Sequence, residues 1–111
     1  MLNMNVSVNK GIMFFNLEGN LTNDTFFELE EALNYLLYKQ GMQYFVFNFS
    51  NLDRVDLDVI NNFKSKLIEI FLCCGNVAVC GVSKIFKNFF GSRDNFFYIN
   101  NQMEAFKYLS I

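Results

Sequence analysis

Three short apolar segments alternate with amphipathic stretches of helix length, and this alternation limits the folds open to the chain. The apolar segments are 12–17, 44–49 and 77–80. Between them, apolar residues recur at helical spacing over 26–37 and again over 60–71. Strands connected through helices lie parallel, with right-handed crossovers. The sequence therefore predicts an α/β domain built on a parallel central sheet.

The N-terminal segment adds a further strand. Met4, Val6 and Val8 alternate with polar residues, which is the period of a half-exposed strand. The tripeptide 9–11, Asn-Lys-Gly, is a turn signal. The chain is therefore predicted to begin with a β-hairpin whose second arm is 12–17.

Further signals place the remaining elements. The two helices are expected to end at Gly41 and Gly75, because glycine readily takes the left-handed conformation found just past a helix. A short helix over 85–90, a short strand over 96–98 and a helix over 101–109 are predicted to follow. The prediction is one α/β domain of all 111 residues. Its sheet is mixed and mostly parallel, with four to five strands, an N-terminal β-hairpin and about four helices packed mainly on one face.

Composition removes several kinds of chemistry. The chain has no histidine, which excludes histidine acid–base catalysis and histidine-ligated metal sites. Its net charge of −2 argues against nucleic acid as a partner, since no basic stripe is present to neutralise phosphates. It also lacks a glycine-rich phosphate-binding loop. We expect no catalysis, no cofactor and no metal.

Cysteine usage indicates a reducing compartment, and hydropathy indicates a chain without a signal peptide or membrane span. Cys73, Cys74 and Cys80 lack the spacing of a redox or zinc motif and are expected to be apolar filler. The N-terminus alternates rather than forming the apolar core of a signal peptide. No segment approaches the ~20 apolar residues of a membrane span. The expectation is a cytoplasmic protein without membrane insertion.

The carboxyl ends of parallel strands meet at one edge of a sheet, and ligands bind there in open α/β folds. In this chain that edge should collect three loops, 19–24, 51–58 and 81–84. The candidate binding residues in these loops are Asn20, Thr22, Asn23, Asp24, Asp56, Leu57, Asp58, Val59 and Ser83.

Helix-start signals occur at two of these loops. Thr25 has capping-box spacing to Glu28, although Thr22 or Asn23 can cap the same helix instead. Asp56 is predicted to cap the second helix near residue 57, which places Asp58 in the first turn, where an anion is favoured. Either the acids form a charged binding surface or they simply cap a helix.

Adjacent phenylalanines also bear on the surface, because neighbouring residues point in opposite directions on a strand or a helix. One member of each pair is therefore hard to bury in a two-layer domain. We expect Phe14 and Phe15 to serve the core, and Phe26 or Phe27, beside the proposed edge, to contribute to an exposed interface.

Taken in order, several segments resemble the STAS domain, the anti-sigma factor antagonist family, over essentially the whole chain. Residues 15–21 resemble a strand ending in Leu-x-Gly-x-Leu, and Thr25 matches the helix-start threonine. Residues 47–52 resemble the strand exit Asp-Leu-Ser-x-Val, and Asp56 falls on the first residue of the motif Asp-Ser-Ser-Gly. Residues 79–83 and 104–106 resemble the fourth strand with its loop and the terminal Glu-Ala-Leu.

The resemblance implies a protein-binding role. In that family the domain binds an anti-sigma factor that is also a serine kinase, and phosphorylation of the serine after the motif aspartate releases the partner. Here Leu57 stands at the acceptor position, Asp58 replaces the second serine and Val59 replaces the glycine. Thr22 stands where many members have an aspartate. Phosphorylation at this loop is therefore not expected.

The predicted function is a non-catalytic bacterial module for signalling and transcription regulation that binds a protein partner, of anti-sigma factor type, through the strand-end edge. An alternative is a STAS-type scaffold or accessory subunit of a transporter or multiprotein complex. A third possibility is a small-ligand binder that uses the same edge.

Overall fold

The computed structural model of the protein describes residues 1–73, 75–82 and 97–108. Its strands are β1 (Leu2–Asn9), β2 (Ile12–Leu21), β3 (Tyr44–Val55), β4 (Asn76–Cys80) and β5 (Phe97–Tyr98). Its helices are α1 (Asn23–Asn34), which continues into the π-helical turn η1 (Tyr35–Lys39), α2 (Leu57–Leu72), the 3-10 turn η2 (Gln102–Glu104) and α4 (Ala105–Tyr108). The helix predicted over 85–90 lies outside the described residues.

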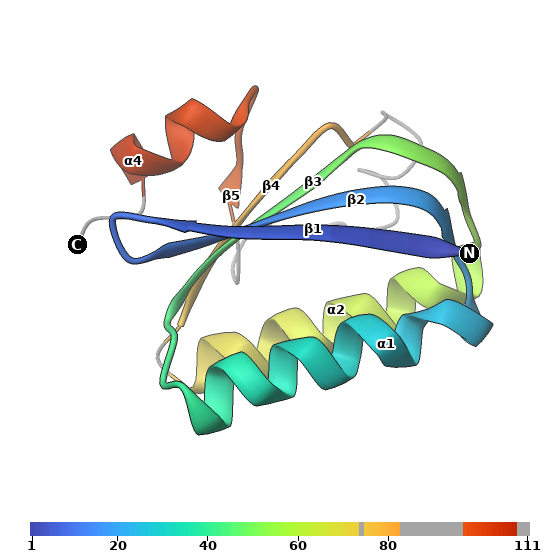
Figure 1. The fold of residues 1–111 in the computed structure, drawn as a ribbon, viewed down its shortest axis with the longest axis horizontal. Helices are drawn as coiled ribbons and strands as arrows, with labels where there is room; N and C mark the ends of the chain where they lie inside the picture. The colour runs from blue at the N-terminus through green and yellow to red at the C-terminus, as the bar shows by residue number, and fades with distance from the viewer. Residues whose placement is uncertain (74, 83–96, 109–111) are drawn as a thin grey trace.

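The strands form one five-stranded sheet in the order β1-β2-β3-β4-β5. β1 and β2 pair antiparallel, and the other neighbours pair parallel. Helices α1 and α2 lie side by side along one face of the sheet, and α4 lies on the other (Figure 1). The predicted α/β class, the N-terminal hairpin and the mixed, mostly parallel sheet are therefore confirmed.

Each face of the sheet has its own apolar core. The larger core, between the sheet and α1 and α2, includes Phe15, Phe47 and Phe63, each at most 1% exposed. The smaller core, under α4, includes Phe14, whose ring centroid lies 5.7 Å from that of Phe106. Because α4 covers the second face, Phe14 and Phe15 are both buried, as expected for the core, although they point in opposite directions.

The strand ends differ from the prediction. β2 continues to Leu21 and β3 to Val55, so half of the predicted loop 19–24 and most of the predicted loop 51–58 are strand. The polar residues there, which favour loops in isolation, still pair across the sheet, from Glu18 opposite Asn51 to Leu21 opposite Val55. The ladder shifts register once before Glu18 and once after Gly19, and Leu21 is buried at its end. Tertiary pairing therefore overrides the local signal.

Candidate functional site

The ends of β2 and β3 bring the starts of α1 and α2 together. Leu21 pairs with Val55, and the Asp56 N–H donates to the Leu21 carbonyl oxygen at 3.0 Å. A single residue then separates each strand from its helix: Thr22 before α1 and Asp56 before α2. Both helices begin at the same end of the sheet (Figure 1). We call residues 20–24 and 56–58 the helix-start edge.

Thr22 and Thr25 fix the first half of this edge. Thr22 is the N-cap of α1, and its N–H donates to the Thr25 hydroxyl oxygen at 3.0 Å. The Thr25 hydroxyl in turn donates to the Asn20 carbonyl oxygen at 2.9 Å. Of the caps left open by the sequence, the structure selects Thr22, with Thr25 rather than Glu28 completing the box. Asn23 and Asp24 are exposed beside them.

Asp56 fixes the second half of the helix-start edge, but its carboxylate has a different partner from the one predicted. It is the N-cap of α2, as expected, and its carbonyl oxygen accepts from the Val59 N–H at 3.1 Å. Its carboxylate does not bond the helix start. Instead, Oδ1 accepts from Arg54 Nε at 2.8 Å, so an arginine on the strand end neutralises this acid.

The next three residues separate into surface and core. Leu57 is 49% exposed, an unusual position for leucine at the first turn of a helix, and Asp58 beside it is exposed. Val59 is fully buried, so its side chain packs beneath the edge rather than on it. The surface presented by α2 at this edge is therefore one apolar side chain next to one carboxylate.

The third predicted part of the edge begins where β4 ends. Gly81 has φ +74°, and a Cβ there would lie 2.5 Å from the backbone nitrogen of Ser50. The chain after β4 therefore packs directly on β3. Burial raises the pKa of the Cys80 thiol to about 11, so this cysteine is an inert core residue, as expected. Ser83 lies outside the described residues.

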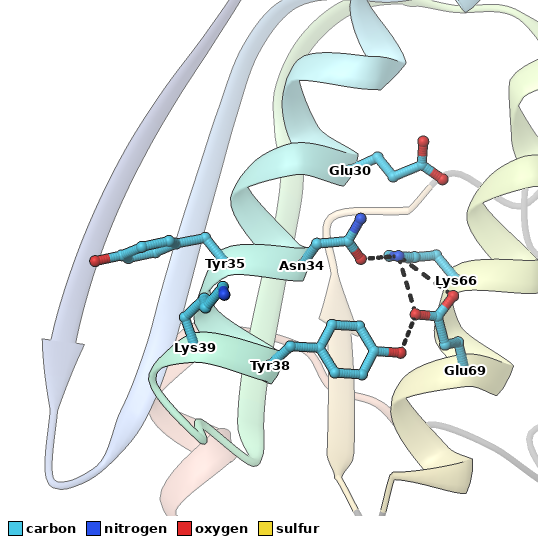
Figure 2. A pocket seen from close by; sticks show the side chains of 7 residues that line it. All are labelled: Glu30, Asn34, Tyr35, Tyr38, Lys39, Lys66 and Glu69. Carbon is cyan, nitrogen blue, oxygen red and sulfur yellow. Dashed lines mark hydrogen bonds and ion pairs between the residues drawn. The ribbon is translucent and has the colours of Figure 1, made fainter.

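A polar cluster between α1 and α2 was missed by the sequence analysis. Lys66 on α2 is a charged residue, yet it is only 5% exposed. Its Nζ donates to Asn34 Oδ1 and to the Glu69 carboxylate oxygens at 3.2 and 3.3 Å (Figure 2). The Tyr38 hydroxyl donates to the same carboxylate. The i,i+3 spacing of Lys66 and Glu69 was the only sequence signal for this contact.

This cluster borders an open groove of about 630 Å³. The groove is lined by Glu30, Asn34, Tyr35, Tyr38, Lys39, Lys66 and Glu69. The bond from Tyr38 is the main cause that lowers the pKa of the Glu69 carboxyl, and the same bond raises the Tyr38 pKa far above its ordinary value. The lining carries two acids and two lysines, so the cluster acts as an interhelical polar clasp rather than as a site with a net charge.

The described residues contain no group of three or more cysteine, aspartate and glutamate side chains placed to hold a metal ion. In the same part of the chain, no helix has both the length and the apolar character needed to span a bilayer.

The contact between Lys66 and Glu69 leads to a prediction about the stability of the fold. We expect Glu69→Gln to destabilise the fold by about 1–3 kcal/mol, because it leaves the buried Lys66 ammonium without its counter-charge. Lys66→Met should change the free energy of unfolding little, since methionine fills the space of the apolar lysine stem and the Glu69 carboxylate remains hydrated. Urea denaturation of both variants at neutral pH measures the difference.

The pH dependence follows from the lowered Glu69 pKa. Its contribution is present above the ordinary glutamate pKa and is lost as the pH falls through the lower value of the folded state. Glu69→Gln should therefore lose less stability than the wild type over that acidic range.

At neutral pH, equal destabilisation by Glu69→Gln and Lys66→Met would show that the ion pair contributes nothing specific to the stability of the fold.

Solved structures similar to this one cover almost the whole chain. The anti-sigma factor antagonist SpoIIAA in its unphosphorylated form has a TM-score of 0.80 at 13% identity, covering 98% of this chain and 100% of that chain. An anti-sigma factor antagonist from Mycobacterium paratuberculosis also has a TM-score of 0.80 at 13% identity, covering 100% and 96%. This protein has the SpoIIAA-like fold. An uncharacterised protein from Shewanella loihica with the same fold has a TM-score of 0.65 at 14% identity, covering 97% and 93%.

No family model and no curated protein matches the sequence. At these identities the SpoIIAA-like fold is what is shared. The roles of individual residues at the helix-start edge therefore have to be argued from the chemistry of this chain.

Proposed function

We propose that this protein is a non-catalytic regulatory module that binds a protein partner through the helix-start edge. The observation that carries the proposal is Leu57, an apolar side chain 49% exposed at the start of α2 and flanked by the exposed carboxylate of Asp58. An exposed leucine between polar groups suits a protein surface, which can bury it, better than it suits a small polar ligand. The end of β2 adds Asn20 to the same surface, and the start of α1 adds Thr22, Asn23 and Asp24.

The partner we propose is an anti-sigma factor or a related regulatory protein of the bacterial cytoplasm. Support comes from the SpoIIAA-like fold, which this chain shares with two anti-sigma factor antagonists. Leucine has no hydroxyl, so Leu57 cannot accept a phosphoryl group. With Asp58 beside it, the edge carries a permanent negative charge in place of one added and removed by a kinase.

The charge of Asp58 gives the test. We expect Asp58→Lys to weaken partner binding more than tenfold, which is about 1.4 kcal/mol, because it reverses the charge in the centre of the proposed surface. The partner is first captured from the native cytosol on the wild-type protein and identified by mass spectrometry. Its affinity for each purified variant is then measured by isothermal titration calorimetry.

Glu31→Lys is the matched control, because it makes the same charge reversal at an exposed position in the middle of α1, away from the edge. Circular dichroism checks that both variants fold. If both bind as the wild type does, the helix-start edge is not the binding surface. If the captured protein is a transporter or a subunit of a large complex, the edge serves a scaffold rather than a sigma-factor switch.

A further inference from the structure

We propose that β1 is a dimerisation strand, which pairs antiparallel with β1 of a second copy of this chain. β1 stands at the edge of the sheet, and no described element covers its outer side. Residues Asn5 to Asn9 are all exposed. This inference is independent of the proposed function, because it concerns a different part of the molecule.

β1 lacks the usual protections of an edge strand. Natural edges are blunted by charged side chains, proline, bulges or short length, since an open row of N–H and C=O groups invites another strand. Residues 2–9 contain no charged residue and no proline. They pair with β2 in unbroken register over all eight residues, so no bulge twists the edge away. The outer side of β1 is therefore a long, regular and neutral pairing surface.

The apolar row of β1 extends beyond its cover. Leu2 is buried, and Met4 is partly buried against the core of α1 and α2. Val6 and Val8 continue the same row but are 43% and 61% exposed. β-branched residues favour strands and pack well against cross-strand neighbours. A second copy at the edge would supply those neighbours.

The sequence of β1 is complementary to itself. In an antiparallel pair with Val6 opposite Val6 of the second copy, Met4 lies opposite Val8, Asn5 opposite Ser7 and Asn3 opposite Asn9. Residues directly opposite share a face of the sheet. Over residues 3–9, apolar side chains therefore meet apolar side chains on one face, and amides and hydroxyls meet on the other, while Leu2 lies opposite Lys10. A second register, in which Met4 lies opposite Val6, also brings Leu2 opposite Val8.

The charges on α1 fit the same two-fold arrangement. α1 runs in the same direction as β1 (Figure 1), with Asp24 in its first turn, and η1 carries Lys39 in its last turn. The two-fold axis that relates the two copies lies between the paired β1 strands, beside Val6, and reverses this direction in the second copy. It places the acidic start of one helix on the same side as the Lys39 end of the other. The helix-start edges would then lie at opposite ends of a ten-stranded sheet, each free to bind a partner.

Sedimentation velocity over a dilution series tests the proposal. We expect the wild type to sediment at twice its 13.0 kDa chain mass at high concentration. Val6→Lys should weaken the dimer by more than about tenfold, because the central apolar pair then becomes two lysines that face each other. Ile68→Lys, on α2, is the matched control, since Ile68 is also 43% exposed. It should dimerise as the wild type does.

Far-UV circular dichroism checks that both variants are folded. The proposal is overturned if the wild type is monomeric at every concentration, or if Val6→Lys dimerises as well as the wild type. Loss of the dimer in Ile68→Lys alone would move the interface to α2.

Discussion

Gly81→Ala is expected to lower the free energy of unfolding by at least about 3 kcal/mol, for two additive reasons. Gly81 has φ +74°, a conformation that costs an L-residue about 1–2 kcal/mol. The added Cβ would also lie 2.5 Å from the nitrogen and 2.9 Å from the Cα of Ser50. These are backbone atoms of β3, the middle strand of the sheet, so they can move aside only if the strand itself bends.

Gly41→Ala distinguishes the cost of the positive φ from the cost of the contact with Ser50. Gly41 has φ +68°, but no atom of the described residues lies within 4 Å of a Cβ built on it. This variant should lose only the conformational part, about 1 kcal/mol. Guanidinium denaturation of both variants measures the difference, which is the cost of the contact with Ser50. Equal losses would mean that the chain after β4 can move away from β3.

The close packing of Gly81 on Ser50 also bears on binding. Ser50 N–H donates to the Asn48 side-chain oxygen at 3.0 Å, and Asn48 Nδ2 donates to Asn16 Oδ1 at 3.0 Å. The bond from Asn48 to Asn16 links β3 to β2 through side chains as well as through the backbone ladder. Such contacts order the strands that carry the helix-start edge before a partner binds, and an ordered surface loses less entropy on binding.

The order of elements could be predicted because it depends on local periodicity. The apolar segment 44–49 and the helical spacing over 60–71 distinguish strand from helix without any knowledge of their neighbours. The helix stop at Gly41 likewise needs only its own backbone conformation. The ends of β2 and β3 could not be predicted, since residues such as Asn20 and Arg54 become strand only when they pair with each other.

The candidate site likewise has features that depend on local sequence and features that depend on tertiary contacts. Asp56 as N-cap and Asp58 in the first turn follow from the residues themselves. The bond from Arg54 to the Asp56 carboxylate and the burial of Val59 depend on how the strand end meets the helix. Lys66 is the extreme case, because its burial requires Asn34 on another helix, 32 residues away. A long charged side chain gives no local sign of such a partner.

Phe63→Ala is expected to cost about 3–5 kcal/mol, since it removes a large side chain from a core that cannot fully collapse around the gap. Phe63 is 1% exposed on α2. Its ring centroid lies 5.1 Å from that of Phe47 and 5.4 Å from that of Phe49, both edge-to-face, and 6.3 Å from that of Phe26 on α1. One side chain therefore ties both helices to β3 close to the helix-start edge.

Phe71→Ala is the matched control for this change. Phe71 lies on the same helix but is 46% exposed, so its truncation should cost less than about 1 kcal/mol. Both substitutions replace phenylalanine by the better helix former alanine, so helix propensity changes equally and the difference reports packing alone. Thermal and urea denaturation give both values. Similar losses would show that the aromatic cluster does not hold α2 on the sheet, and the position of Leu57 and Asp58 would then need another support.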